Sequence, residues 1–169
     1  MISRRSVLWA GLAAGCARNS ESTLADFRTF MNALPRQTAG KVSFEPWRLE
    51  GKVVLVTFIA TWCFPCLTEL RVINRLESDH ATKGFANVLV GMDLEGRQVL
   101  EPFAEGYGLT VPLLVGDDRL RSGETVFGRI RELPSRVLFG RSGDLVVGYS
   151  GIAQYESLDR LVVSEIAKK

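Results

Sequence analysis

Apolar residues along this chain fall into short continuous runs that alternate with segments of helical periodicity. The continuous runs are typical of strands buried on both faces of a sheet, and they predict strands at 53–60, 86–92, 112–115, 136–139 and 145–149. Elsewhere apolar residues recur every three or four positions, which predicts helices at 63–77, 97–107 and 155–167. The turn at 140–143 joins the last two strands as a hairpin. This order predicts an α/β fold with a central mixed sheet flanked by helices.

Weaker signals mark three short segments. Residues 24–34 have helical spacing and end before Pro35, with Ser22 as a candidate cap, so they form either a helix or part of a tether. Residues 42–44 are expected to form a short edge strand. Residues 124–127 are expected to form a short helical piece.

The first 19 residues differ from the rest of the chain. Arg4 and Arg5 precede an apolar run of about ten residues and then small residues, which is the form of a secretory signal rather than a membrane span. The start also resembles a twin-arginine signal, and the letters AAGC at 13–16 resemble a bacterial lipobox, in which Cys16 would be acylated. The alternative is a cleaved signal that removes Cys16 or leaves it as a spare thiol. We therefore expect an export signal at 1–19, a tether or N-terminal helix at 20–40 and one domain at 41–169.

Charge gives no indication of a nucleic-acid partner. The chain has 21 basic and 19 acidic residues, and loss of Arg4 and Arg5 with the leader would leave 19 of each. A neutral mature domain without a basic patch gives no reason to expect nucleic acid or an anionic membrane surface as a partner. At 169 residues the chain is long enough for one domain with its own core.

The candidate chemistry lies in the segment WCFPC at 62–66. With Cys16 assigned to the leader, Cys63 and Cys66 are the remaining cysteines, and they stand at the junction of a predicted strand and a predicted helix. The first sulfur there lies over unpaired N–H groups, which favour a thiolate. Cys63 is therefore the predicted nucleophile, and Cys66 the cysteine that resolves its mixed disulfide.

A zinc half-site is the alternative use of this cysteine pair. Tetrahedral zinc needs two more ligands, yet no other cysteine remains and His80 is the sole histidine. His80 stands near the end of a predicted helix, where a cation or a solvated loop residue is expected. We therefore expect no metal. Trp62 and Phe64 flank the nucleophile and are expected to form an apolar surface for substrate.

The stretch from Gly51 to Glu69 resembles the active-site region of thioredoxin-like proteins of the TlpA/ResA type. These are membrane-tethered, extracytoplasmic thiol–disulfide oxidoreductases. The resemblance implies a thioredoxin-like fold over about residues 41–167, no soluble cofactor, protein thiols and disulfides as substrates, and another thiol protein as electron donor. In such relatives the direction is usually reduction, for example of apocytochrome c.

The resemblance also implies roles for three further residues. Glu69 matches an acidic residue that lies near the dithiol and assists proton transfer, and the alternative is a helix carboxylate that faces solvent. The segment ELPS at 132–135 matches the cis-proline loop, so that Pro134 would pack beside the sulfurs and the backbone of Leu133 would pair with substrate. The alternative for Pro134 is an ordinary trans proline at the start of a strand.

Several positions depart from the family pattern. Thr57 stands where thioredoxins carry a buried aspartate, and a threonine cannot take a proton from Cys66. Other departures fall at Ile59, Arg71, Arg136 and Gly140. None of them touches the dithiol, but together they leave the substrate open.

The function predicted from sequence is an extracytoplasmic thiol–disulfide oxidoreductase, anchored by a lipid on Cys16, that reduces protein disulfides. Two rivals remain. An oxidase or isomerase of secreted proteins would have the same residues, because the reduction potential decides the direction. A non-enzymatic binding or assembly module would present Trp62 and Phe64 to a partner without using the thiols.

Overall fold

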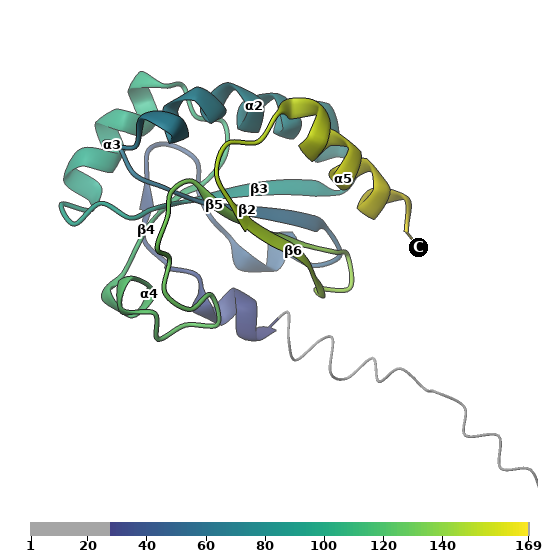
Figure 1. Cartoon of the computed structure of the whole chain (residues 1–169), viewed down its shortest axis with the longest axis horizontal. Coiled ribbons are helices and arrows are strands. Elements are labelled where there is room, and N and C mark those ends of the chain that lie inside the picture. Colours follow the sequence, from purple (N-terminus) through teal and green to yellow (C-terminus); the bar gives the residue numbers. More distant parts are fainter. Residues whose placement is uncertain (1–27, 169) are drawn as a thin grey trace, which may run out of the picture.

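A computed structural model describes residues 28–168, which form a six-stranded mixed sheet covered by helices on both faces (Figure 1). The spatial order is β1-β4-β3-β2-β5-β6. The strands are β1 (Thr38–Ala39), β2 (Val53–Ile59), β3 (Phe85–Gly91), β4 (Leu113–Val115), β5 (Ser135–Phe139) and β6 (Leu145–Ser150). Strands β2, β3 and β4 run parallel, whereas β1, β5 and β6 are antiparallel to their neighbours. The mixed sheet predicted from the alternation of elements is confirmed.

Strands β2 and β3 form the centre of the sheet, and every residue of both is buried. Their continuous apolar runs are explained by this position, because a parallel strand covered on both faces has no solvent side. Alternate residues point to opposite faces: Val54, Val56 and Phe58 belong to one core cluster, whereas Val53 and Leu55 belong to another. The sheet therefore separates two layers of core.

Three helices cover one face of this sheet, namely α2 (Phe64–His80), α3 (Arg97–Gly106) and α5 (Tyr155–Ala167) (Figure 1). The other face is covered by the helical residues 28–33 and by α4 (Asp118–Ser122). Two 3-10 helices, η1 (Pro46–Leu49) and η2 (Ala81–Lys83), precede β2 and β3. Phe30 and Leu34 are buried in the core on the second face.

Two of the weaker predictions were wrong. Residues 42–44 form no strand, and the edge strand is instead Thr38–Ala39, which pairs with β4. Residues 124–127 form no helix, and the short helix lies earlier at Asp118–Ser122. Asp117 starts that helix by accepting from the N–H of Leu120, at 2.9 Å. Gly123 ends it with φ of 85°, a left-handed conformation that glycine adopts without strain.

The N-terminal predictions are tested only in part. Residues 28–33 are helical and the helix ends before Pro35, as the spacing predicted. Ser22, the export signal at 1–19 and Cys16 lie outside the described residues. No helix within residues 28–168 is long and apolar enough to cross a bilayer.

Candidate active site

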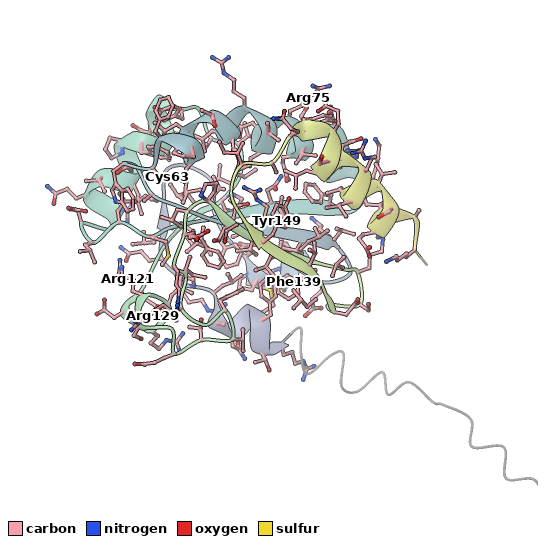
Figure 2. All side chains as sticks on the ribbon, in the orientation of Figure 1. Cys63, Arg75, Arg121, Arg129, Phe139 and Tyr149 are labelled. Atoms are coloured by element: carbon pink, nitrogen blue, oxygen red, sulfur yellow. A yellow bond between two sulfur atoms is a disulfide. The ribbon has the colours of Figure 1, made fainter. Side chains whose placement is uncertain are left out.

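Cys63, which is labelled in Figure 2, and Cys66 lie where β2 ends and α2 begins. Their sulfurs are joined in a disulfide. Cys63 is the N-cap of α2, and its Sγ accepts a hydrogen bond from the N–H of Cys66 at 3.2 Å. Pro65 occupies the first turn, where its missing N–H leaves no bond unmade. Cys63 is 4% exposed and Cys66 is fully buried. An incoming thiol or disulfide therefore reaches Cys63 first.

The turn before the dithiol is held by a buried aspartate. Asp93, which follows β3, is 1% exposed. Both of its carboxylate oxygens lie 3.1 Å from the N–H of Thr61, and the Thr61 hydroxyl donates to Oδ1. Asp93 was not predicted from the sequence to belong to the site. The available signal was an acidic residue directly after a buried parallel strand, at the edge of the sheet where the cysteines also lie.

The segment 132–135 contacts the core cluster that contains both cysteines. The Leu133–Pro134 peptide bond is cis, which is the geometry implied by the family resemblance and not the trans alternative. Pro134 is buried, and its carbonyl accepts from the N–H of Gly151 at 2.8 Å. Leu133 packs against the core cluster that contains both cysteines. A polypeptide that approaches Cys63 therefore meets the backbone of this segment as well.

The surface around the cysteines is apolar and exposed. Trp62 is 72% exposed and Phe64 is 74% exposed, as expected for residues that flank a reactive sulfur. Leu94, directly after Asp93, is 83% exposed and was not singled out from the sequence. A groove between α2 and α3 begins at Phe64 and continues past Arg71. These side chains offer an extended partner both apolar and polar contacts.

Glu69 lies one helical turn after Cys66 and is 3% exposed, which excludes the alternative of a helix carboxylate that faces solvent. One carboxylate oxygen accepts from the Arg136 guanidinium, and the other accepts from the N–H of Ala153 in the turn before α5. Burial raises the pKa of Glu69 above its ordinary value, while the Ala153 N–H and the Arg136 charge act to lower it. Arg136 was noted in the sequence only as a departure from the family, yet it is the ion-pair partner of Glu69.

His80 lies at the end of α2, as expected, but it is buried rather than solvated. Its Nε2 lies 2.6 Å from Oδ1 of Asp159 on α5. The Tyr155 hydroxyl donates to the same carboxylate oxygen at 3.1 Å and to Asp79 at 2.6 Å. Within residues 28–168, no three His, Cys, Asp or Glu side chains gather as metal ligands would. The contacts of His80 therefore tie α2 to α5.

Two solved structures with a similar fold are described as thiol–disulfide proteins. A thiol-disulfide isomerase from Corynebacterium glutamicum superposes with a TM-score of 0.67 at 16% identity, over 80% of this chain and 95% of that one. A putative thiol:disulfide interchange protein DsbE from Chlorobium tepidum gives a TM-score of 0.66 at 21% identity, over 77% of this chain and 92% of that one. At these identities the likeness establishes the fold, and the thioredoxin-like prediction is confirmed.

Sequence relatives extend the comparison. The thiol-disulfide oxidoreductase ResA of Halalkalibacterium halodurans is 29% identical over 109 residues, which is 64% of this chain and 60% of that protein. The thioredoxin-like protein YneN of Bacillus subtilis is 37% identical over 68 residues, 39% of each chain. The chain thus spans about three fifths of the length of the ResA protein that it matches. The sequence profile of the AhpC/TSA family matches residues 26–139, more than half of the chain, and the protein therefore belongs to the AhpC/TSA family.

Proposed function

We propose that this protein is a thiol–disulfide oxidoreductase that reduces disulfides of other proteins outside the cytoplasm. The observation that carries the proposal is the Cys63–Cys66 disulfide at the N-terminus of α2. The cis Leu133–Pro134 bond supports it, because Leu133 packs against the core cluster that contains both cysteines. A pair of cysteines three residues apart closes too short a loop to add much stability, so a chemical use is favoured. Relatives named as thiol-disulfide oxidoreductases support the same activity.

The reaction proceeds in two steps that balance electrons and protons. The Cys63 thiolate attacks one sulfur of a substrate disulfide, forming a mixed disulfide and releasing the first substrate thiolate, which takes up a proton. Cys66 then loses its proton and attacks Sγ of Cys63, which releases the second substrate thiol and leaves the Cys63–Cys66 disulfide. The substrate gains two electrons and two protons, and a donor thiol protein returns the pair to the dithiol. No soluble cofactor takes part.

The surrounding residues have distinct roles in this proposal. The α2 N-terminus stabilises the Cys63 thiolate, because its unpaired N–H groups and dipole favour negative charge. Trp62 and Phe64 provide the apolar contact for substrate, and the backbone of Leu133 pairs with the bound polypeptide. Glu69 accepts the proton of Cys66 during the second step.

The N-terminal sequence supports a location outside the cytoplasm for this chemistry. The basic start, the apolar run and the AAGC letters support export and a lipid anchor on Cys16. Labelling cells with a fatty-acid analogue tests the anchor. Label is expected on the wild-type protein and not on a Cys16→Ala variant, and equal labelling of the two would remove lipidation from the proposal.

The direction of the reaction is tested by the reduction potential. Equilibration with glutathione buffers is expected to give a potential more negative than about −220 mV, which suits a reductase. A value near about −120 mV, typical of strong folding oxidants, would instead establish the oxidase rival.

Two cysteine variants test the chemistry itself. Cys63→Ser is expected to abolish disulfide reduction, whereas Cys66→Ser is expected to accumulate mixed disulfides with substrate. A Cys63→Ser protein with wild-type activity would exclude the proposal. A wild-type protein that reduces no disulfide, and whose thiols react as slowly as free cysteine, would favour a binding module.

A further inference from the structure

A row of polar side chains crosses the sheet beneath α2. The strand register places Thr57 of β2 opposite Arg136 of β5, and Arg136 opposite Tyr149 of β6. Residues paired in this way share one face of a sheet, and Leu55 and Leu138 on that face pack in the core with α2 and α5. The Arg136 side chain is 1% exposed there. A buried charge without compensation is strongly destabilising, so this arginine requires a partner.

The partner comes from α2. Nη2 of Arg136 donates to one oxygen of Glu69, and the Ala153 N–H donates to the other oxygen. The Tyr149 ring, labelled in Figure 2, lies 4.9 Å from Cζ of Arg136 and shields the guanidinium on the side of β6. Nη1 of Arg136 is buried and has no hydrogen-bond partner within the described part of the chain. Arg136 therefore depends on Glu69 for charge compensation.

The pair lies next to the dithiol. Glu69 follows Cys66 by three positions on α2, and residues so spaced are neighbours on one helix face, with about 5–6 Å between their Cβ atoms. Arg136 follows Pro134 by two positions and is the second residue of β5, the strand that the cis-proline segment enters. The ion pair thus joins the two segments that provide the resolving cysteine and the substrate-contacting backbone.

We propose that Arg136 is a positioning residue that keeps Glu69 ionised and fixed one turn from Cys66. The inference rests on the proposed function. In the second step the Glu69 carboxylate takes the proton of Cys66, and the Cys66 thiolate attacks Sγ of Cys63. The bond between Cys63 and the substrate sulfur breaks, and the leaving thiolate takes the proton back from Glu69. No further oxidant, reductant or proton donor is needed.

The expected pH dependence follows from the groups that face Glu69. Cys66 lies beside it on α2, Arg136 faces it from β5 with Tyr149 behind, Thr57 of β2 does not ionise, and the turn before α5 contributes the N–H of Ala153. Because burial alone raises the pKa of Glu69, loss of the Arg136 charge would raise it further. The second step needs the ionised carboxylate, so its rate falls as pH falls through the Glu69 pKa. Without Arg136 this fall begins at a higher pH.

Stopped-flow mixing of the fully reduced protein with 5,5′-dithiobis(2-nitrobenzoate) separates the two steps. The first equivalent of coloured thiolate reports attack by Cys63, and the second reports attack by Cys66. The rate of the second phase is measured as a function of pH. In Arg136→Gln the acid limb of this pH–rate profile is expected to move up by about one pH unit or more, so that at a given pH on the limb the second phase is about tenfold slower. Arg136→Lys keeps a positive charge, so its pH–rate profile for the second phase is expected to lie nearer that of the wild type.

Matched variants make this result specific. Arg141→Gln is the matched control, because Arg141 binds the backbone carbonyls of Gly51 and Lys83 and not Glu69. The rate of the second phase in Arg141→Gln should match that of the wild type. In a Glu69→Gln background, Arg136→Gln should cause no further shift. A folded Arg136→Gln protein whose second-phase profile coincides with that of the wild type overturns the inference and leaves the proposed function standing.

A measurement on the wild-type protein tests the inference even if Arg136→Gln fails to fold. The carboxyl carbon of Glu69, labelled with ¹³C and assigned by its loss in Glu69→Gln, is expected to report an ionised group at pH 7 in the reduced protein. A protonated Glu69 at pH 7 overturns the inference. If the reduced wild-type protein releases no coloured thiolate from 5,5′-dithiobis(2-nitrobenzoate), the proposed function fails instead. The carboxyl signal still decides the charge state of Glu69 in that case.

Discussion

Asp93 accepts hydrogen bonds from both the backbone N–H and the hydroxyl of Thr61, in the turn that leads into Cys63. The contact joins the ends of the parallel strands β2 and β3. The backbone carbonyl of Asp93 in turn accepts from Nη2 of Arg121 on α4, at 2.9 Å. The Asp93 carboxylate thus fixes the chain immediately before the nucleophile, and the Asp93 backbone carbonyl links this turn to the opposite layer of the fold.

We expect Asp93→Ala to destabilise the protein by about 1–3 kcal/mol, because the N–H and hydroxyl of Thr61 lose their acceptor in a largely buried site. Asp93→Asn retains one acceptor oxygen and should have a smaller effect. Urea unfolding measures the change in free energy of unfolding. Asp118→Ala, which removes a fully exposed aspartate, is the control. Equal stabilities of Asp93→Ala and Asp118→Ala would contradict the assigned role of Asp93.

Trp62 and Phe64 are expected to matter for protein substrates and not for small disulfides. Each side chain is largely exposed, so Trp62→Ala and Phe64→Ala should leave stability nearly unchanged. An aromatic anchor in a protein contact contributes about 1–2 kcal/mol, so KM for a protein disulfide should rise roughly 5–30-fold. Rates with a small aromatic disulfide should stay near wild type.

The matched control for this surface is Trp47→Ala. Trp47 is 65% exposed, but it lies on η1 with Met31 and Pro46 around it rather than beside the dithiol. Its substitution should leave KM for the protein substrate unchanged. A similar increase in KM for all three variants would show that general surface hydrophobicity, and not the position beside Cys63, is responsible.

The elements that sequence predicted well are those with strong internal periodicity. The central strands are continuous apolar runs, and α2 carries Leu70, Ile73 and Leu76 on one face, so both could be located from the residues alone. The edge strand Thr38–Ala39 could not, because a two-residue strand has no pattern and exists only through its pairing with β4. Helix α4 was misplaced because its start depends on the Asp117 cap rather than on apolar spacing.

The candidate site divides in the same way. Cys63 and Cys66 are recognised by their spacing at a strand-to-helix junction, which is a local signal. The Glu69–Arg136 pair joins residues 67 positions apart, and neither residue indicates the other in the sequence. In the sequence Thr57 and Arg136 are two separate departures from the family pattern, yet in the structure they are neighbours on the adjacent strands β2 and β5. Contacts of this kind follow from strand register, which local patterns do not determine.

Glu77 is expected to stabilise the free edge of β3. Strand β4 is only three residues long, so the N–H of Asn87 extends beyond it and donates instead to Oε2 of Glu77 at 2.8 Å. Glu77→Ala leaves that N–H without an acceptor and should lower the free energy of unfolding by about 1–3 kcal/mol. Glu77→Gln keeps an acceptor oxygen. Urea unfolding that ranks Glu77→Gln below Glu77→Ala would contradict this role.

Burial also raises the pKa of Glu77, which gives the comparison a pH dependence. An acid whose pKa is raised by folding is favoured in its protonated form. Wild-type stability should therefore gain from this group at low pH and lose that gain as pH rises through the raised pKa. In Glu77→Gln this contribution is absent. The free energy of unfolding of the wild type, relative to that of Glu77→Gln, should thus decrease as the pH rises from acid to neutral.

Tyr155 is expected to ionise later than an ordinary tyrosine. Its hydroxyl donates to Asp79 at 2.6 Å and to Asp159 at 3.1 Å. The hydrogen bond to Asp79, followed by burial and the hydrogen bond to Asp159, raises the pKa of Tyr155 to about 12. The raised pKa means that the hydroxyl stabilises the fold below the ordinary tyrosine pKa of about 10, and that this contribution is lost as pH rises through about 12. Absorbance titration of tyrosinate in wild type and Tyr155→Phe should differ by one late transition. Asp79→Asn should move that transition toward 10, with a smaller movement in Asp159→Asn. A late transition that persists in Tyr155→Phe would assign it to Tyr107 or Tyr149 instead.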